Sequence, residues 1–344
     1  MNKKILIIKP SGIGDIVHSL PVAIGLKLIY PYCKIHWVVF NKFKDILYGL
    51  DYIDEIILWN RNGGLKEYIR LIEELKKQNY DLIIDLQVLF RTALLGYLLK
   101  FKKIISTSYI REFSNFFVSP VAKFDKNLHA VERNYQVVEF LAKKENKSVP
   151  KPIDLLPWIK INKNEDEYAK KLLEFDSNKK YIFFSVGSRG QHKIWPKENF
   201  LELINLLYKK FKNLFLVFVG SKEEIDRVNW VISNLHLKEY KNFVGYTDLH
   251  QLCALLNNAA VVVSNDSGVA HISAALDRPT LVLFGPSDPT WFYPYNMKSG
   301  YIYKNLKCSP CGIKTLCKNN RCMQEITPQE VFEYIDKNFS SYLL

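Results

Sequence analysis

The sequence lacks any long apolar segment. Its first apolar run, residues 5–8, has only four residues and follows Met1-Asn2-Lys3-Lys4, which is too short for the core of a signal peptide or for a membrane span. Acidic residues are also scarce, with 35 Asp and Glu against 48 Lys and Arg and a net charge of +13. These features predict a cytoplasmic protein with an anionic partner, such as a membrane surface, a phosphorylated lipid or nucleic acid.

The third glycine of a dinucleotide-binding fingerprint is missing. Gly12 and Gly14 follow the predicted strand 4–8, but Val17 stands where the next glycine would be, so a nicotinamide cofactor is poorly supported. The chain has no basic helix or aromatic RNA-binding motif. This lack argues against a nucleic-acid partner.

Cysteine is sparse, and four of the six cysteines fall in one segment. Their spacing is C-x2-C-x5-C-x4-C, at Cys308, Cys311, Cys317 and Cys322. Four thiolates can hold a structural zinc ion, although these gaps are short for a zinc ribbon. Four reduced cysteines in a compact loop are the alternative, and neither the spacing nor the compartment compels a bound metal.

Strand and helix patterns alternate twice along the chain. The first series predicts strands at 36–40, 55–59 and 82–86, and the second begins at residue 181. The intervening segment 147–157 contains three prolines, as interdomain linkers often do. We therefore predict an α/β protein with two Rossmann-like domains, at residues 1–155 and 156–325, followed by a C-terminal helix at 326–344.

Residues 264–289 are the stretch around which the second series is organised. A β-branched strand at 261–263 stops at Ser264-Asn265-Asp266-Ser267, and Gly268 opens an apolar helix. The unpaired N–H groups of a helix start favour a phosphate at this point. An ordinary β-α-β crossover with a capped helix is the alternative.

Several motifs lie in order over nearly the whole chain. They are Lys9-Pro10-Ser11-Gly12-Ile13-Gly14-Asp15-Ile16-Val17-His18-Ser19-Leu20-Pro21, Asp85-Leu86-Gln87, His129-Ala130-Val131-Glu132-Arg133, Lys193-x-Trp195-Pro196 and Asn265-Asp266-Ser267-Gly268-x-x-His271. Together they resemble heptosyltransferases of glycosyltransferase family 9. The resemblance implies a GT-B fold with two domains facing a central cleft, an ADP-heptose donor, and the lipopolysaccharide inner core (Kdo-lipid A or first heptose) as acceptor.

The same resemblance implies roles for individual residues. Asp15 matches the general base of an inverting transfer. The donor-binding residues that it implies are Ser188, Lys193, Asp266, Ser267, Gly268, His271 and one of Glu223 and Glu224. Independently of the resemblance, the positive charges of Arg61, Lys66 and Arg91 predict contact with an anionic acceptor, and Gly14 and His18, beside Asp15, complete the predicted acceptor-binding residues. The family often has threonine at the position of Ser267. Lys193 and the helix N–H groups supply positive charge at the diphosphate, so we expect catalysis without a divalent metal or other cofactor.

Three other functions fit part of the sequence. A nucleotide-sugar epimerase of the same fold would keep the donor site but use no lipid acceptor, and a non-catalytic nucleotide-sugar sensor would not need Asp15. A zinc-bearing nucleic-acid binder would leave both of the turns predicted to bind phosphate without a function. For the transferase we expect peripheral association with the inner face of the cytoplasmic membrane, through Arg61, Lys66, Arg70 and Arg91.

Overall fold

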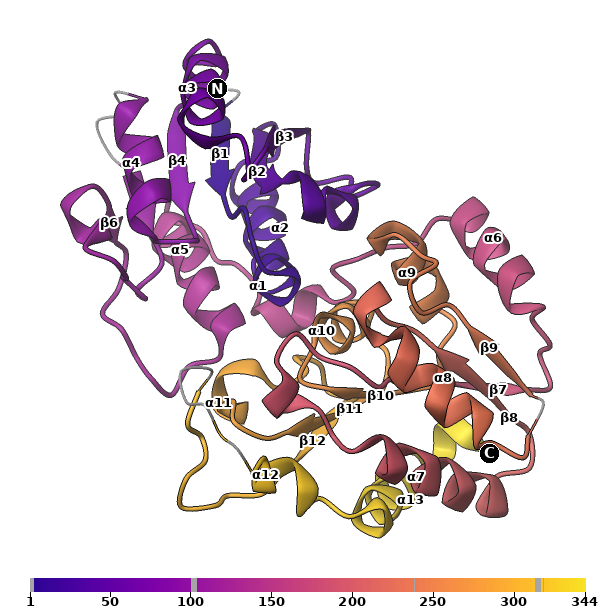
Figure 1. Cartoon of the computed structure of the whole chain (residues 1–344). Helices are drawn as coiled ribbons and strands as arrows, with labels where there is room; N and C mark the ends of the chain where they lie inside the picture. Colours follow the sequence, from indigo (N-terminus) through magenta and orange to yellow (C-terminus); the bar gives the residue numbers. More distant parts are fainter. Residues whose placement is uncertain (1–2, 100–103, 238, 313–316, 318) are drawn as a thin grey trace. The chain divides into compact units, whose positions relative to one another are not determined.

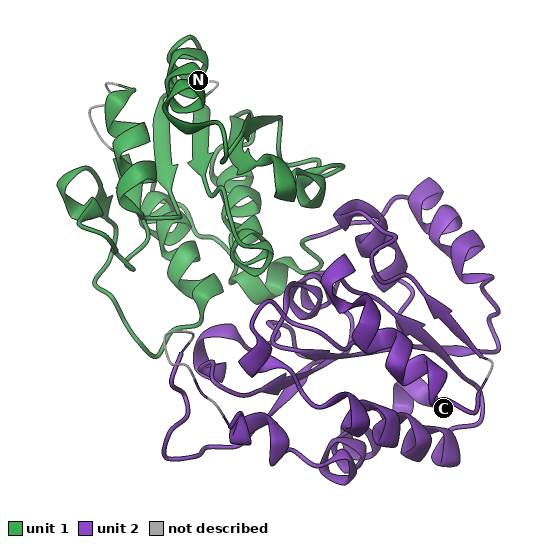
Figure 2. Cartoon of the chain, in the orientation of Figure 1, with its two compact units in different colours: residues 1–158 green, residues 159–344 purple. Residues whose placement is uncertain are grey.

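The computed structural model describes residues 3–99, 104–237, 239–312, 317 and 319–344 (Figure 1). The chain divides into two compact units, Met1–Trp158 and Ile159–Leu344 (Figure 2). The division falls just after the proline-bearing segment 147–157. Among the described residues, no helix is long and apolar enough to cross a bilayer.

Unit 1 contains a six-stranded parallel sheet in the order β3-β2-β1-β4-β5-β6. Its central strand β1 has Ile5, Leu6, Ile7 and Ile8 fully buried, as expected for a strand covered on both faces. The strands are β1 (Lys4–Ile8), β2 (Lys34–Phe40), β3 (Glu55–Trp59), β4 (Leu82–Asp85), β5 (Ile104–Ser106) and β6 (Ser119–Pro120).

Helices connect these strands. The α-helices are α1 (Ile13–Val17), α2 (Leu20–Ile29), α3 (Gly64–Lys76), α4 (Phe90–Leu98) and α5 (Ala130–Lys144), with 3₁₀ segments η1 (Asn41–Leu47), η2 (Ser114–Phe116) and η3 (Pro152–Leu155). The sequence predicts one helix after Asp15, but the chain breaks between α1 and α2. Pro21 has no N–H to donate to a preceding turn, and the Ser19 hydroxyl instead bonds the Asp15 carbonyl at 2.8 Å.

Unit 2 repeats this architecture with the strand order β12-β11-β10-β7-β8-β9. The strands are β7 (Lys180–Ser185), β8 (Leu214–Phe218), β9 (Tyr240–Asn242), β10 (Val261–Asn265), β11 (Thr280–Phe284) and β12 (Gly300–Tyr303). The helices are α6 (Lys163–Leu173), η4 (Gln191–Lys193), α7 (Lys197–Lys210), η5 (Lys222–Glu224), α8 (Ile225–Ser233), α9 (Leu249–Leu256), α10 (Gly268–Ala275), α11 (Pro289–Phe292), α12 (Arg321–Gln324) and α13 (Pro328–Leu343). Two parallel sheets with crossover helices confirm the predicted α/β class.

The C-terminal helix α13 belongs to unit 2. It packs against α7, and its residues Val331, Ile335, Phe339 and Leu343 are part of the same apolar core as the strands of that unit. The sequence analysis set residues 326–344 apart from the second domain. The apolar face of α13, repeating every four residues, explains why the helix is instead part of that domain's core.

The strand order places the candidate sites. In each sheet the order reverses once, between β1 and β4 in unit 1 and between β7 and β10 in unit 2. Right-handed crossovers put helices on both faces on either side of such a switch, and open α/β sheets bind ligands just beyond the carboxyl ends of the strands there. Asp15 follows β1, and Asp266 follows β10.

Candidate active site

In unit 2, Asn265 joins the loop after β7 to the end of β10. Its side-chain amide donates to the carbonyls of Val186 at 3.0 Å and Gly187 at 3.2 Å, and its Oδ1 accepts from the Trp195 backbone N–H at 3.0 Å. Asn265 is fully buried. These bonds fix the loop that carries Ser188 and Lys193 beside the start of α10. The sequence analysis included Asn265 in a motif but gave it no role.

Asp266 is the centre of this site. Its Oδ2 accepts from Lys193 Nζ at 2.5 Å and from Ser287 Oγ at 2.6 Å, while Ser188 Oγ donates to its backbone carbonyl at 2.8 Å. His271 Nε2 lies 3.8 Å from its Oδ1. Burial raises the pKa of this carboxyl, but Lys193, His271 and Ser287 more than offset that effect and hold the pKa below its usual value. Asp266 is therefore an anion that positions a cation.

The first turn of α10 lies next to this ion pair. Its N-cap Ser267 makes no side-chain capping hydrogen bond, and the Ser267 hydroxyl instead lies 2.9 Å from Ser264 Oγ. The backbone N–H groups of the turn are consequently not occupied by the cap side chain. Positive charge from Lys193 and from the helix start is concentrated at one point, as a phosphate site requires.

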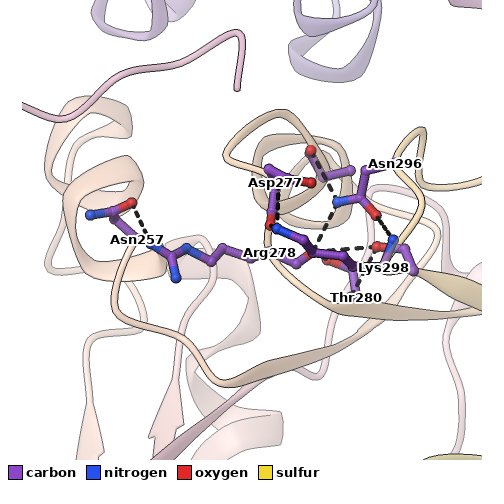
Figure 3. Close-up of polar contacts among 8 residues, drawn as sticks. Asn257, Asp277, Arg278, Thr280, Asn296 and Lys298 are labelled. Carbon is purple, nitrogen blue, oxygen red and sulfur yellow. Dashed lines mark hydrogen bonds and ion pairs between the residues drawn. The ribbon is translucent and has the colours of Figure 1, made fainter. Parts of the chain in front are cut away.

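The other end of α10 is fixed by a polar network (Figure 3). Asn296 Nδ2 donates to the carbonyl of Ala274, in the last turn, at 3.2 Å and to the Arg278 carbonyl at 3.0 Å. The Arg278 side chain donates to Asn257 Oδ1 at 2.9 Å, and Lys298 pairs with Asp277. These bonds satisfy carbonyls that a helix end leaves unpaired and hold α10 in place.

The structure separates the two neighbouring glutamates after β8. Glu223 is exposed, whereas Glu224 is partly buried against Gly187 and Gly220. A Cβ on either glycine would lie 2.2 Å from the Glu224 carboxyl group, so only glycine admits this side chain. Burial raises the pKa of Glu224, and hydrogen bonds from Ser221 and the Gly187 backbone act in the opposite direction. Glu224 is the one that reaches the carboxyl ends of β7 and β8.

In unit 1, Asp15 is the third residue of α1 and is exposed. The preceding Gly12 has φ of +84°, and a Cβ there would lie 2.4 Å from Asp15 Oδ2. Gly12 is thus required both by its left-handed backbone and by the carboxylate that folds over it. Asp15 does not serve as the N-cap, because that position is Gly12. Its carboxylate is accessible at the end of β1.

His18 lies in the interior of unit 1 beside the α1 turn. Its ring packs edge-on against His129 with 5.1 Å between the ring centroids, and Asn134 Nδ2 donates to its carbonyl at 3.3 Å. His129 is the N-cap of α5, and Glu132 completes a capping box with it. His129 and Glu132 of this motif therefore cap the helix, and the capped helix start supports the turn that carries Asp15.

Two predicted acceptor residues, Arg61 and Arg91, come together over one aromatic side chain. Their guanidinium carbons lie 5.9 Å and 5.3 Å from the centre of the Phe40 ring, and Arg91 also lies 5.8 Å from Trp59. Burial and the charge of Arg61 lower the pKa of Arg91. Arg91 Nε is buried without a hydrogen-bond partner among the described residues. Two repelling cations and an unsatisfied donor are suited to an anion.

Lys66 and Arg70, the other two basic residues predicted to contact an anion, differ in their surroundings. Lys66 is exposed on the first turn of α3, whereas Arg70 is paired with Glu67 and Glu74 at 2.6 Å each. The charge of Arg70 is largely compensated by these two carboxylates.

Gly14, also predicted to bind the acceptor, is partly buried, and its carbonyl accepts a hydrogen bond from the His18 N–H at 2.8 Å.

Arg111 was not predicted from the sequence, and Lys9 was part of a motif but had no predicted role. Arg111 Nη2 donates to the Gln87 carbonyl, just beyond β4, at 2.8 Å. The fully buried Lys9 donates to the Leu86 carbonyl at 2.9 Å, and burial lowers its pKa while Asp15 raises it. No local pattern marks Arg111, because the sheet brings it to the end of β4 from a distant part of the chain.

The four clustered cysteines line one pocket of about 320 Å³, together with His192 and Asn320. Burial raises the pKa of the Cys322 thiol, and the three neighbouring thiols add to the effect. Within the described ranges, however, no three His, Cys, Asp or Glu side chains are grouped as metal ligands. A structural zinc ion at these four thiols therefore stays a prediction.

Comparison with known proteins identifies relatives over almost the full length. The sequence model described as glycosyltransferase family 9 (heptosyltransferase) matches residues 68–321. The lipopolysaccharide core heptosyltransferase OpsX of Haemophilus influenzae is 27% identical over 86% of this chain and 82% of its own, and lipopolysaccharide heptosyltransferase 1 of Campylobacter coli is 27% identical over 98% and 99%. The structure of E. coli ADP-heptose lipopolysaccharide heptosyltransferase II superposes with a TM-score of 0.80, at 24% identity, over 98% of this chain and 99% of that one. This match shows that the two share the GT-B fold.

Proposed function

The chain belongs to glycosyltransferase family 9, and we propose that it transfers a heptose, with inversion, from ADP-heptose to the inner core of lipopolysaccharide. The observation that carries this proposal is the Lys193–Asp266 pair at the start of α10, at the switch point of the unit 2 sheet. The relatives, which include lipopolysaccharide heptosyltransferases 1 and 2, support the same substrate class.

In this proposal the donor diphosphate binds at the start of α10. Lys193 has two N–H donors left after its bond to Asp266. The backbone N–H groups of Ser267 and Gly268 add partial positive charge at the same helix start. Ser188 and His271 flank Asp266 and complete the site. Because a cation and a helix start supply the positive charge, no divalent metal is needed to stabilise the leaving ADP.

The adenosine ribose is assigned to Glu224. An acidic residue that follows the neighbouring strand in such a sheet accepts hydrogen bonds from ribose hydroxyls. Glu224 meets this requirement because it is held at the ends of β7 and β8, whereas Glu223 is exposed.

The transfer is a single displacement at the anomeric carbon. An acceptor hydroxyl forms the new C–O bond while its proton passes to the Asp15 carboxylate. The bond to the diphosphate breaks, and its electron pair leaves on the phosphate oxygen of ADP, where Lys193 and the helix N–H groups stabilise the charge. Attack opposite the leaving group inverts the anomeric configuration.

The acceptor is assigned to unit 1, where Arg61 and Arg91 meet over Phe40. Phosphate and carboxylate groups of an inner-core glycolipid suit two guanidinium groups, which bind such oxygens in a bidentate fashion. Lys66, Gly14 and His18 lie on the turns that surround Asp15 and β3. The net charge of +13 favours peripheral association with the anionic inner face of the cytoplasmic membrane.

The decisive test is incubation of the purified protein with ADP-heptose and two truncated acceptors, Kdo-lipid A and its mono-heptosylated form, followed by mass spectrometry. We expect one of the two acceptors to gain a single heptose. Conversion of the nucleotide sugar without any acceptor product would favour an epimerase, and ADP-heptose binding without turnover would favour a sensor.

A further inference from the structure

Helix α4 exposes apolar side chains on its outer face. Phe90 and Tyr97 are 46% and 55% exposed, and Leu94, between them on the same face, is partly exposed. The buried face of the helix carries Thr92, Ala93, Leu95 and Gly96. Residues spaced by three and four positions share one side of a helix, so the solvent-facing side of α4 is apolar.

The segment around η2 extends this surface. Phe113 and Phe116 are 77% and 74% exposed. Phe117 joins the two segments, because its ring centroid lies 5.5 Å from that of Phe90 and 5.3 Å from that of Tyr97. We refer to Phe90, Leu94, Tyr97, Phe113, Phe116 and Phe117 as the α4–η2 patch.

The backbone before η2 shows that the outward position of Phe113 is maintained at a cost. Glu112 and Phe113 are consecutive residues with left-handed backbones, at φ of 52° and 57°. This conformation is unfavourable for bulky side chains and persists where the surrounding structure enforces it. Clustered exposed aromatic residues on a protein surface mark an interaction site.

The charged residues near the α4–η2 patch indicate which kind of partner it contacts. Phe90 is adjacent in the chain to Arg91, whose guanidinium group lies over Phe40 with that of Arg61. The first turn of α4 therefore contributes a residue to the apolar patch and a residue to the candidate anion site. Residues 1–158 also contain 24 Lys and Arg against 16 Asp and Glu. An apolar surface beside a cationic one, on a positively charged unit, is complementary to the headgroups and upper acyl chains of an anionic bilayer.

We propose that the α4–η2 patch inserts into the interface of an anionic lipid bilayer and brings the anion site of unit 1 to the headgroups of membrane-embedded acceptors. The inference rests on the proposed function for the lipid nature of the acceptor. Aromatic side chains settle at the headgroup level, so the contact is shallow and reversible. The apolar contact adds to the electrostatic attraction that the net charge provides.

The test uses the full chain and flotation with two kinds of vesicle, one of mixed phosphatidylcholine and phosphatidylglycerol and one of phosphatidylcholine alone. Phe113 and Phe116 are changed together to serine, or together to tryptophan. The matched control is Tyr32→Ser, which removes a side chain that is 79% exposed and precedes β2, at the amino end of the same sheet. Each variant is also assayed for heptose transfer to a water-soluble, deacylated acceptor.

We expect the wild-type protein and Tyr32→Ser to bind the anionic vesicles alike and to keep part of that binding at 1 M salt. The serine double variant should lose at least about tenfold in partition coefficient and all of the salt-resistant part, whereas the tryptophan double variant should bind as wild type. Activity on the soluble acceptor should be unchanged in every variant.

Equal vesicle binding by the wild-type protein and the serine double variant would overturn the inference. A change from dimer to monomer on sedimentation, with vesicle binding intact, would also overturn it and assign the patch to a contact between copies. Failure of the proposed function has a separate signature, because the wild-type protein would then transfer no heptose even to the soluble acceptor.

Discussion

Lys193 Nζ lies 2.5 Å from Oδ2 of Asp266, the residue that links β10 to α10. The side chain of this lysine is 15% exposed and that of the aspartate 7%. Buried ion pairs add little to stability unless other hydrogen bonds complete them, and here the Ser287 hydroxyl donates to the same carboxylate oxygen. The pair holds a cation at the helix start, where the leaving group of a glycosyl transfer gathers charge.

Lys193→Ala should weaken ADP binding by about 1.5 to 3 kcal/mol, the contribution of a charge-assisted hydrogen bond. Isothermal titration calorimetry measures the effect directly. Lys212→Ala, at an exposed position in the same unit, is the matched control and should bind ADP as the wild-type protein does. An unchanged affinity in Lys193→Ala would move the diphosphate to another site.

Glu224→Gln should weaken ADP binding by roughly 1 kcal/mol, and Glu223→Gln should have almost no effect. The reason is that only Glu224 is packed against Gly187 and Gly220 at the strand ends. Calorimetry with 2′-deoxy-ADP gives the internal control, since the deficit of Glu224→Gln should shrink when a ribose hydroxyl is absent. A larger loss in Glu223→Gln would reverse the assignment.

Much of the fold follows from the sequence, because both series of strands are runs of apolar and β-branched residues such as Val261, Val262 and Val263. The motif residues Lys193 and Asp266 could also be placed, since each follows such a strand. The inclusion of α13 in the core of unit 2 depends on tertiary packing. Arg111 could not be found, because only the sheet brings it to the end of β4.

The sequence alone also could not decide between Glu223 and Glu224. Both precede α8 and carry the same charge, and adjacent residues cannot be told apart by a periodic pattern at a turn. Two glycines from separate loops create the space that only Glu224 fills. Such complementarity is a property of packing and not of the local sequence.

Asp85→Asn should make the free energy of unfolding depend less on pH. Burial raises the pKa of Asp85 from 3.8 to about 6, against hydrogen bonds from Val88, Thr92 and Gln87. The folded protein binds the carboxyl proton of Asp85 more tightly than the unfolded chain does. Protonated Asp85 therefore adds to the free energy of unfolding below about pH 4, and this contribution is lost as the pH rises through 6. Asparagine keeps an acceptor for the backbone N–H groups of Gln87 and Val88, which bond Asp85 Oδ1 at 2.9 Å.

The variant's free energy of unfolding, relative to wild type, should therefore increase by up to about 3 kcal/mol between about pH 4 and 7. Urea denaturation at several pH values measures it. A difference that does not vary with pH would show that Asp85 does not titrate in this range.

Heptose transfer should be unaffected by EDTA, because Lys193 and the start of α10 supply the positive charge that a divalent cation would otherwise provide. The measurement is the initial rate with and without chelator. Loss of activity that magnesium restores would contradict this account.

If elemental analysis finds zinc, we expect it at Cys308, Cys311, Cys317 and Cys322, and its removal should lower Tm while ADP affinity stays constant.

The central claim is that Asp15 removes the acceptor proton while unit 2 holds the donor, and Asp15→Asn tests it most directly. Asparagine keeps the size and polarity of the side chain over Gly12 but cannot accept the proton. The measurement is the turnover number at saturating ADP-heptose together with the ADP dissociation constant of the same preparation. We predict an unchanged dissociation constant and a turnover at least about a hundredfold lower, whereas turnover near the wild-type value would contradict the account.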